Sequence, residues 1–354
     1  MYSSKLSPAL AAIWHFLLLA PQAITSPVPT HKSLATRDTI PSYALTYAPY
    51  THLYSGEKWW PSDIAIHVQH VTPKVNYAPV ASNVTLENLN TFSTDTYLTS
   101  DDNVADSPDW LLSAYGMPDS AGYSTAPATI IVAPKNDCVV DVFYFYFYSY
   151  NRGNSFADIE FGDHVGDWEH TMIRFINEVP TYVFLSEHSS GAAYNYSVLP
   201  QNNSRPVTYI AVGTHANYAT VGKQNYEPIS LDTITDTTDA GLYWDVTANY
   251  RGFFYDNSTG TFTSAGGADI GGSEQAAEGT GWLTWLGAWG DEQYPDNHSG
   301  QYCVFGECHY VSGPTGPLSK NLWRVTVCED QSKACDIQTS LKKRDEGDMI
   351  SNSS

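Results

Sequence analysis

The segment from Phe161 to His170, Phe-Gly-Asp-His-Val-Gly-Asp-Trp-Glu-His, holds the densest group of polar side chains in the sequence. If a strand begins at Asp167, the carboxylates of Asp167 and Glu169 point to the same face, because side chains on a strand repeat every two residues. His164 comes from the preceding loop, where two glycines permit a tight backbone. Two carboxylates and one imidazole at this spacing predict a site for a divalent cation.

Two further histidines follow predicted strands. His188 lies in the segment Ser186–Gly191 and His215 in the segment Gly213–Tyr218. If these loops meet the first one at one edge of the sheet, their oxygen and imidazole ligands would suit Mg, Ca, Mn or Zn. The alternative is that the histidines only hydrogen-bond to loop backbone, and the spacing leaves both open. The predicted metal ligands are His164, Asp167, Glu169, His188 and His215.

The same ligands could activate a metal-bound water, so a metal-dependent hydrolase is the alternative function. Ser186 and Ser189 lie beside His188, but closeness in sequence is poor evidence for a catalytic triad. The sequence has no GxSxG, HExxH or Walker motif. A structural glycoprotein of the cell surface or wall, with no site, is the third interpretation. The residues alone do not decide whether the protein is an enzyme.

The clearest predicted strand, Asp141–Tyr150, separates its aromatic rings by kind. Its phenylalanines point to one face and its tyrosines to the other. Phenylalanine suits a sealed core, whereas tyrosine hydroxyls need partners or water. We therefore expect the tyrosine face to border a wet cleft or surface. The predicted ligand-binding residues are Tyr144, Tyr146 and Tyr148.

Further strands are predicted over 168–175, 182–185 and 207–212, between turns rich in Gly, Pro, Asn and Asp. The 25 Tyr, 10 Trp and 13 Phe also favour strands. Consecutive short strands predict an all-β fold, a single large antiparallel β-sandwich with long loops. Its domain spans 43–335. The Gly-rich, acidic stretch 265–281 is expected to be a mobile surface loop.

The formal net charge of −21 excludes nucleic acid as a partner, because phosphate binding needs a basic surface. It also argues against simple electrostatic docking to anionic lipid. An acidic chain suits an acidic lumen or the cell exterior, and it suits sites for divalent cations.

The N-terminal residues 1–26 have the layout of a secretory signal peptide, with Lys5 before an apolar run and small residues at Ala23 and Ser26. The run is too short for a transmembrane helix, and no later stretch is long enough for one. We expect a flexible lead-in over 27–42, a disordered polar tail over 336–354, and a location in the vacuolar lumen or outside the cell. Six N-glycosylation sequons agree with this route. They begin at Asn83, Asn195, Asn202, Asn257, Asn297 and Asn352.

Five cysteines are expected to lie in an oxidising compartment, and an odd number leaves one without a partner in the chain. The sequence does not determine their connectivity. We expect two local bridges among the four C-terminal cysteines, with Cys138 as a buried thiol. The four are Cys303, Cys308, Cys328 and Cys335.

Several segments resemble the Vps62 family in content and order, over about residues 45–328. They are Leu53–Ser62, Tyr146–Gly153, Gly162–Glu169, Ser186–His188, Gly213–Tyr218, Trp289–Asp291 and Gly313–Pro317 with Lys320. The resemblance implies a link to vacuolar protein sorting without a settled biochemical activity. The expected function is a secretory-pathway glycoprotein that binds a divalent cation and a glycan or glycolipid headgroup.

A shorter stretch is similar to necrosis- and ethylene-inducing-like proteins, which carry a Gly-His-Arg-His-Asp-Trp-Glu block. Here His164, Asp167, Trp168 and Glu169 match it, while Gly166 replaces the second His. In that family the block helps to hold a divalent cation in a β-sandwich that recognises sphingolipid headgroups. The resemblance therefore supports a cation site, and the missing His speaks against toxin activity.

Overall fold

The computed structural model describes residues 39–156, 159–225, 235–269, 279–304 and 306–341. The expected signal peptide, most of the lead-in and most of the polar tail lie outside these residues. At the described end of the lead-in, Ile40 is buried. Within the described part, no helix is long and apolar enough to cross a bilayer.

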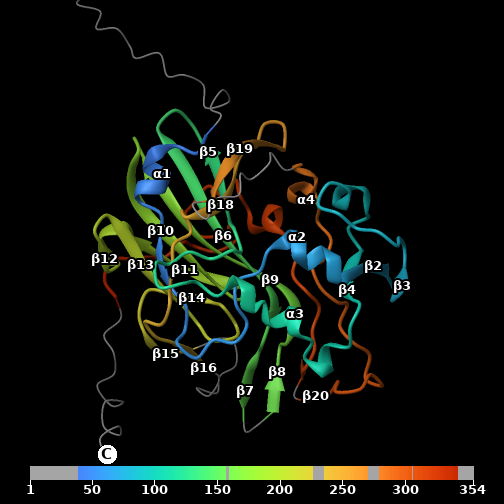
Figure 1. Ribbon diagram of the computed structural model, residues 1–354. Helices are drawn as coiled ribbons and strands as arrows, with labels where there is room; N and C mark the ends of the chain where they lie inside the picture. Colours follow the sequence, from blue (N-terminus) through green and yellow to red (C-terminus); the bar gives the residue numbers. More distant parts are fainter. Residues whose placement is uncertain (1–38, 157–158, 226–234, 270–278, 305, 342–354) are drawn as a thin grey trace, which may run out of the picture. The chain divides into compact units, whose positions relative to one another are not determined.

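An eight-stranded sheet forms the centre of the fold (Figure 1). Its neighbours pair antiparallel from β5 to β11 and from β18 to β19, whereas β18–β5 and β11–β22 are parallel. The predicted all-β class is confirmed, although the sheet is mixed. In spatial order the strands are β19 (Thr261–Asp269), β18 (Asn249–Asp256), β5 (Ala128–Pro134), β6 (Val139–Asn151), β9 (His164–Ile176), β10 (Val179–Glu187), β11 (Ser190–Asn195) and β22 (Ile337–Gln338).

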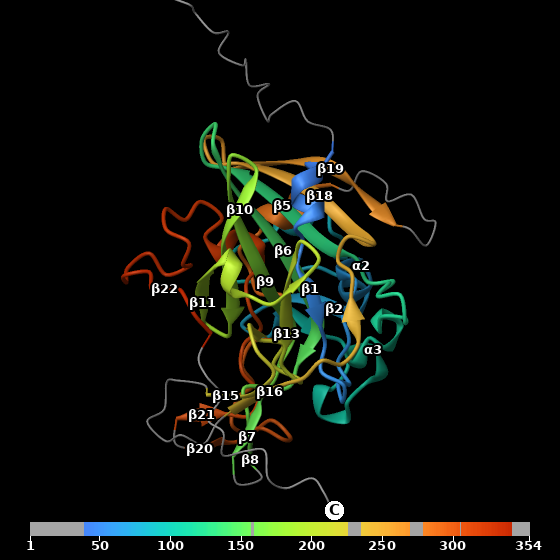
Figure 2. The ribbon, with the colours of Figure 1, turned by 90° about the vertical axis from the view of Figure 1, so that its left-hand side faces the viewer.

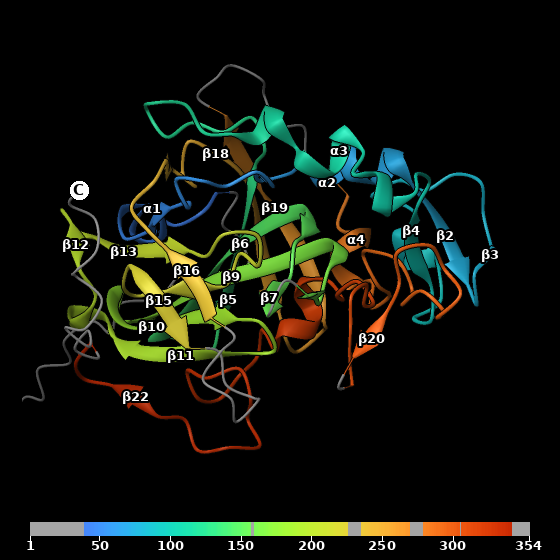
Figure 3. The ribbon, with the colours of Figure 1, turned by 90° about the horizontal axis from the view of Figure 1, so that it is seen from below.

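Smaller sheets and short helices surround the central sheet (Figures 2 and 3). One is formed by β12 (Gln201–Asn202), β13 (Arg205–Ile210), β1 (Tyr50–His52) and β17 (Tyr243–Trp244), with β14 (Asn217–Tyr218) on β13. Another joins β3 (Ala78–Pro79), β2 (Val71–Val75) and β4 (Tyr97–Ser100). Three hairpins are β7 (Asn154–Phe156) with β8 (Ile159–Phe161), β15 (Gly222–Asn225) with β16 (Thr235–Thr238), and β20 (Cys303–Val304) with β21 (Glu307–Cys308).

The described helices are one or two turns long and lie between strands. The α-helices are α1 (Ser42–Thr46), α2 (Ile64–His67), α3 (Asp109–Leu112) and α4 (Gly281–Thr284). The 3-10 turns are η2 (Val68–His70), η3 (Leu89–Thr91), η4 (Val104–Asp106), η5 (Ala114–Gly116), η6 (Tyr196–Val198) and η7 (Pro317–Lys320). Part of the expected loop over 265–281 is in fact strand, because residues 265–269 complete β19 against β18; residues 270–278 lie outside the described ones.

Strand β6 is buried on both faces, which corrects the prediction for its tyrosines. The phenylalanine face packs in a cluster with Trp168, Met172 and Trp289. The tyrosine face packs in a second cluster with Trp244. The side chains of Tyr144, Tyr146 and Tyr148 have 0% exposure, so they border no wet cleft.

Segments distant in sequence seal the tyrosine face and supply hydrogen-bond partners in place of water. The Tyr144 hydroxyl donates to the carbonyl of Ala44 in α1 at 2.5 Å. The Tyr146 hydroxyl donates to Thr171 Oγ1 at 3.0 Å and lies 3.3 Å from Thr51 Oγ1 of β1. The hydroxyls of Tyr144 and Tyr146 are thus satisfied inside the protein, whereas that of Tyr148 has no partner in the described part of the chain.

The two predicted local disulfides are present, Cys303–Cys308 and Cys328–Cys335. Cys138 is a free thiol, as expected, but it is exposed. It lies in the turn between β5 and β6, where the chain reverses at the end of the sheet, so the prediction that it is buried was wrong.

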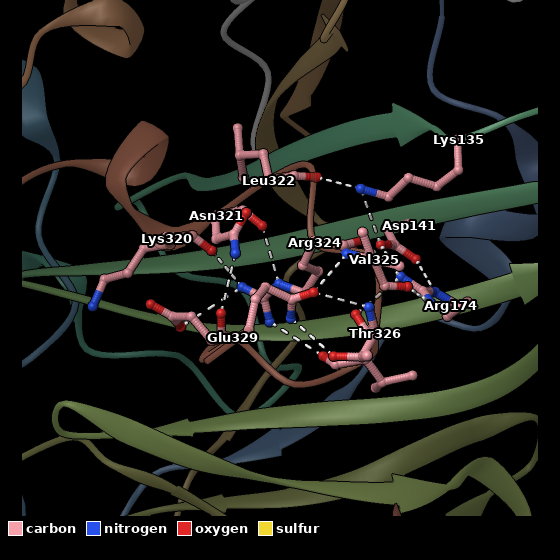
Figure 4. A network of polar contacts seen from close by, with 12 residues as sticks. Lys135, Asp141, Arg174, Lys320, Asn321, Leu322, Arg324, Val325, Thr326 and Glu329 are labelled. Atoms are coloured by element: carbon pink, nitrogen blue, oxygen red, sulfur yellow. Dashed lines mark hydrogen bonds and ion pairs between the residues drawn. The ribbon is translucent and has the colours of Figure 1, made fainter. Parts of the chain in front are cut away.

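A network of buried charges attaches the segment 320–329 to β6 and β9 (Figure 4). Arg174 of β9 makes two hydrogen bonds to Asp141 of β6, at 2.7 and 2.8 Å. It also donates to three consecutive carbonyls, those of residues 324, 325 and 326. Arg324 is 1% exposed and lies over the rings of Phe143 and Phe184. The C-terminal segment is thus held by side chains of the central sheet.

Candidate functional site

Strand β9 places the two predicted carboxylates on one face of the sheet. Asp167 pairs with Tyr148 and Glu169 with Tyr146 across the β6–β9 ladder. Residues directly opposite each other share a face, so both carboxylates lie on the tyrosine side, as their spacing predicts. Asp167 is 5% exposed and Glu169 is 3% exposed. Two buried acids therefore lie two residues apart at the beginning of a central strand.

Gly166 determines the backbone conformation between His164 and Asp167. Its φ is +68°, and a Cβ at this position would lie 2.4 Å from the carbonyl oxygen of Trp289. Its own carbonyl is 2.7 Å from Nδ1 of His164. Glycine is required here by the backbone angle and by the close approach, and the bond to its carbonyl fixes the orientation of the His164 ring.

Replacing Gly166 with alanine is expected to destabilise the protein by about 1–3 kcal/mol more than replacing Gly162 with alanine, because only Gly166→Ala adds a clash. Gly162 is the matched control, since its φ is +86° but nothing lies within 4 Å of its would-be Cβ. Urea unfolding of both variants measures the difference. Equal losses of stability would show that the contact with Trp289 yields without strain.

Asp167 is held by His215. Asp167 Oδ2 lies 2.9 Å from His215 Nδ1, and His215 Nε2 lies 3.0 Å from the carbonyl oxygen of Trp59. The imidazole stacks on the ring of Tyr148 at 3.6 Å. Because both ring nitrogens face acceptors, neither is available to a metal in this arrangement. His215 instead orients the Asp167 carboxylate, as residues behind metal ligands do.

Glu169 accepts a hydrogen bond from the Ser186 hydroxyl. The same hydroxyl oxygen accepts the backbone N–H of His170 at 2.7 Å, which fixes its direction. Burial raises the pKa of the Glu169 carboxyl well above its usual value, and the negative charge of Asp167 raises it further. Two acids this close favour either a retained proton or a cation between them.

His188 belongs to a separate pair with Asp236, a residue that the sequence analysis missed. His188 Nε2 lies 2.7 Å from Asp236 Oδ2. Asp236 also accepts hydrogen bonds from Tyr218, Thr214 and Asn154, at 2.6, 2.8 and 2.9 Å. Burial raises the pKa of Asp236, but the His188, Tyr218 and Asn154 side chains outweigh it and bring the pKa to about 2. These bonds also join the ends of the hairpins β7–β8 and β15–β16.

Glu57 is a second carboxylate that sequence reasoning missed. Its Oε1 accepts the backbone N–H groups of Lys58 and Trp59, at 2.8 and 3.0 Å. Its Oε2 accepts the N–H of Gly213 at 3.0 Å and lies 4.0 Å from His215 Nε2. Glu57 therefore ties the loop before α2 to the loop that carries His215. It lies within Leu53–Ser62, a segment noted only for its family resemblance.

The donor atoms left over at this site are two carboxylate oxygens and one imidazole nitrogen, but His164, Asp167 and Glu169 do not bring their ligand atoms within 4.8 Å of one another. Among the described residues, Asp167 Oδ1, Glu169 Oε1 and His164 Nε2 have no hydrogen-bond partner. The hydroxyl of Tyr148 is buried without a partner. Burial lowers the pKa of His164, which favours the neutral imidazole that binds metals. To hold an ion, the three side chains would have to move closer together, with His215 and Ser186 behind them.

A second group of potential ligands lies immediately before His164. In the described part of the chain, Glu160, Asp163 and His309 are the three residues whose ligand atoms all lie within 4.8 Å of one another. Their groups already have partners, because Tyr150 donates to Asp163 at 2.5 Å and Arg152 forms an ion pair with Glu160. Burial raises the pKa of Asp163 to about 6. The group could hold a metal, at the expense of these contacts.

The chain is similar in sequence to proteins named for vacuolar protein sorting. The family model "Vacuolar protein sorting-associated protein 62" matches residues 134–255, from the end of β5 to β18. "Putative vacuolar protein sorting-associated protein TDA6" of Saccharomyces cerevisiae is 34% identical over 88% of this chain and 74% of that protein. "Vacuolar protein sorting-associated protein 62" of the same yeast is 32% identical over 84% of this chain and 70% of that protein. The chain is a member of the Vps62 family.

Solved structures similar to this Vps62-family protein are distant. "NLPPya in complex with mannosamine" shares 10% identity over 60% of this chain and 72% of that chain, with a TM-score of 0.28. Necrosis and Ethylene inducing Protein 2, from the causal agent of cocoa's Witches Broom disease, shares 12% identity over 58% of this chain and 72% of that chain, with a TM-score of 0.27. Similarity of this size carries no conclusion about ligand or activity.

Proposed function

We propose that this Vps62-family protein has a role related to vacuolar protein sorting and acts in the vacuolar lumen or another lumenal or extracellular space. Its site holds one divalent cation and uses it to bind a glycan or glycolipid headgroup. The family relationship supports the sorting-related role, since both yeast relatives are named for vacuolar protein sorting. The net charge of −21 supports a cation partner.

The observation that carries the proposal is the pair of buried acids on β9. Asp167 and Glu169 lie on the same face, and each keeps one oxygen without a hydrogen-bond partner among the described residues. Buried like charges are unfavourable unless a proton or a cation lies between them. Mg²⁺ is commonly held by one or two carboxylates together with water, so this pair could hold the ion once the two carboxylates and His164 move closer together.

Because the three tyrosines are buried, we assign the ligand-binding surface to Trp59 instead. The Trp59 ring is half-buried, and its backbone carbonyl is bonded to His215 beside Asp167. The guanidinium of Arg152 lies 5.6 Å from the centre of the Trp59 ring. An accessible indole suits the apolar face of a sugar, and a neighbouring guanidinium suits hydroxyl or anionic groups of a headgroup.

Asp167→Asn is expected to abolish stoichiometric cation binding. Elemental analysis after dialysis should find one divalent ion per wild-type chain and none per variant. Chelation should destabilise the wild type, by about 2.7 kcal/mol if the ion is present at 100 times its dissociation constant, and should leave the variant unchanged. Glu160→Gln is the matched control for the neighbouring group. An ion that persists in Asp167→Asn but is lost in Glu160→Gln would place the metal at Glu160, Asp163 and His309.

Headgroup binding is tested with glycan and glycolipid arrays in the presence and absence of a chelator. The proposal expects binding that requires the cation and that falls at least tenfold in Trp59→Ala, since the indole would supply stacking area. Binding that survives chelation, or that is indifferent to Trp59, would contradict it.

A metal-dependent hydrolase is the second candidate, favoured by the raised pKa of the Glu169 carboxyl beside Asp167. A carboxyl with a raised pKa is a better candidate for a general acid than an ordinary one. A screen of phosphoesters, esters and glycosides separates the two functions. Turnover that disappears in both Asp167→Asn and Glu169→Gln would replace the binding function with catalysis.

A further inference from the structure

A groove with a volume of about 530 Å³ lies along the loop from Ser82 to Glu87, far from β9 in sequence. Residues of α2, η2 and β2 form its other wall. Its buried lining is apolar and includes Val68, Val71, Val84 and Leu86. Its exposed rim is polar and includes Gln69 and Asp101. The groove is large enough for a ligand of several rings.

Asn83 is part of the lining of this groove and is exposed. It begins the sequon Asn83-Val-Thr85, and Thr85 lines the groove too. The loop is held in shape by Asn88, which accepts the N–H of Thr85 at 2.8 Å and donates to the backbone carbonyl of Asn83 at 3.3 Å. These bonds use only backbone atoms of the sequon, so the Asn83 side chain is left at the groove.

We propose that Asn83 carries an N-linked glycan whose first sugars lie in this groove. A pyranose ring has an apolar face of C–H groups and an edge of hydroxyls. Most of the groove surface is polar, and the Gln69 amide and Asp101 carboxylate suit the hydroxyls. The valines and leucine at its bottom, each 5–7% exposed, offer a small apolar contact to the ring face. The glycan is covalently attached at the groove, so the effective concentration of its sugars there is high. The site therefore requires little intrinsic affinity.

The other sequons differ from Asn83 in their surroundings. Asn257 lies in the turn between β18 and β19, where residues 256–260 are all exposed. Asn297 is exposed as well, whereas Asn195 and Asn202 are half-buried within β11 and β12. The hydroxyl of Ser204, in the Asn202 sequon, is bonded to the carbonyl of Thr46 at 3.0 Å. Glycans are expected at Asn83, Asn257 and Asn297. Only the glycan at Asn83 is expected to be protected by a groove.

The inference rests on the lumenal route in the proposed function, and glycopeptide mass spectrometry of protein secreted by a fungal host tests both. The native protein is treated with an endoglycosidase. Release of the Asn83 glycan should be at least tenfold slower than release of the Asn257 glycan, and denaturation should make the two rates equal. Gln69→Trp, which fills the groove from its rim, should remove the protection at Asn83 alone.

Asn83→Gln and Asn257→Gln form a matched pair for stability. Loss of the Asn83 glycan should lower Tm by several degrees relative to loss of the Asn257 glycan. Glycans at Asn257 and Asn297 with none at Asn83, or equal release rates in the native protein, would overturn the groove assignment while leaving the lumenal route intact. Absence of glycan from every sequon would overturn the lumenal route itself.

Discussion

Replacing Asp141 with alanine is expected to lower the free energy of unfolding by about 3–5 kcal/mol, the loss typical of a buried ion pair deprived of one partner. The Asp141 side chain has 0% exposure and lies between Arg174, at 2.7 Å, and Lys135, at 3.4 Å. Without it, two mostly buried cations face each other with no carboxylate between them (Figure 4). Urea unfolding measures the loss.

The matched control is Asp330→Ala, which breaks an ion pair with Lys333 whose two side chains are 47% and 82% exposed. Exposed pairs of this kind contribute little to stability, because water screens them. A loss in Asp141→Ala no larger than in the control would show that the remaining cations are solvated by water.

Arg174→Met should have a second effect, because Arg174 also donates to the carbonyls of residues 324, 325 and 326. Its loss frees the C-terminal segment from β9, so hydrogen exchange should rise over 320–329. In the double variant Asp141→Ala/Arg174→Met, the stability loss should be smaller than the sum of the two single losses, since the two residues share one interaction. Additive losses would contradict the ion pair as the main contact.

The central strands could be predicted from the sequence because their pattern is local. The Phe and Tyr alternation of 141–150 lies within β6, and the segments 168–175 and 182–185 lie within β9 and β10. The predicted strand over 207–212 ends at Ile210 instead, in β13. Period-two alternation identifies a strand and its two faces, but it does not say what covers each face.

The burial of the tyrosine face could not be read from β6 alone. The hydroxyls of Tyr144 and Tyr146 are satisfied by the Ala44 carbonyl and by Thr51 and Thr171, and the first two partners are about a hundred residues away in the chain. A local pattern of polar tips is equally consistent with water and with such distant partners. Likewise, Cys138 is exposed because of its place in a turn, although cysteine is among the most buried residue types.

Part of the candidate site could also be predicted from local sequence, and part of it could not. Asp167 and Glu169 share a face because their spacing requires it, and Gly166 has the positive φ that its loop needs. Glu57 and Asp236 were not predicted as partners of His215 and His188. Each lies in a segment at least 48 residues away from its histidine in the chain. Carboxylates are common in an acidic chain, so nothing in the sequence distinguishes these two.

The Asp291 carboxyl is expected to contribute stability at acid pH that is lost toward neutral pH. Asp291 is 5% exposed and its Oδ1 has no hydrogen-bond partner in the described part of the chain. Burial raises its pKa from 3.8 to about 6. The folded state therefore binds this proton more tightly than the unfolded state. The stabilisation is fully present below about pH 4 and is lost as pH rises through 6, a difference of about 3 kcal/mol.

Asp163, whose pKa is also about 6, acts in the same direction. Asp236 and Asp245 act in the opposite one, because their pKa values are lowered to about 2. Their contribution is present above about pH 4 and is lost as pH falls through 2, and burial of His67, which lowers its pKa to about 3, adds a loss that begins as pH falls below 6.5.

Asp291→Asn isolates the Asp291 contribution. The amide imitates the protonated acid and can still accept the N–H of Ser100, which lies 3.4 Å from Asp291 Oδ2. The variant should match the wild type at pH 3.5 and exceed it by up to about 3 kcal/mol at pH 7.5. Urea midpoints at pH 3.5, 6.0 and 7.5 measure this, and the same pH dependence in both proteins would refute it. A difference between the two proteins that grows with pH implies that Asp291 stabilises the fold in acid by keeping its buried carboxyl protonated.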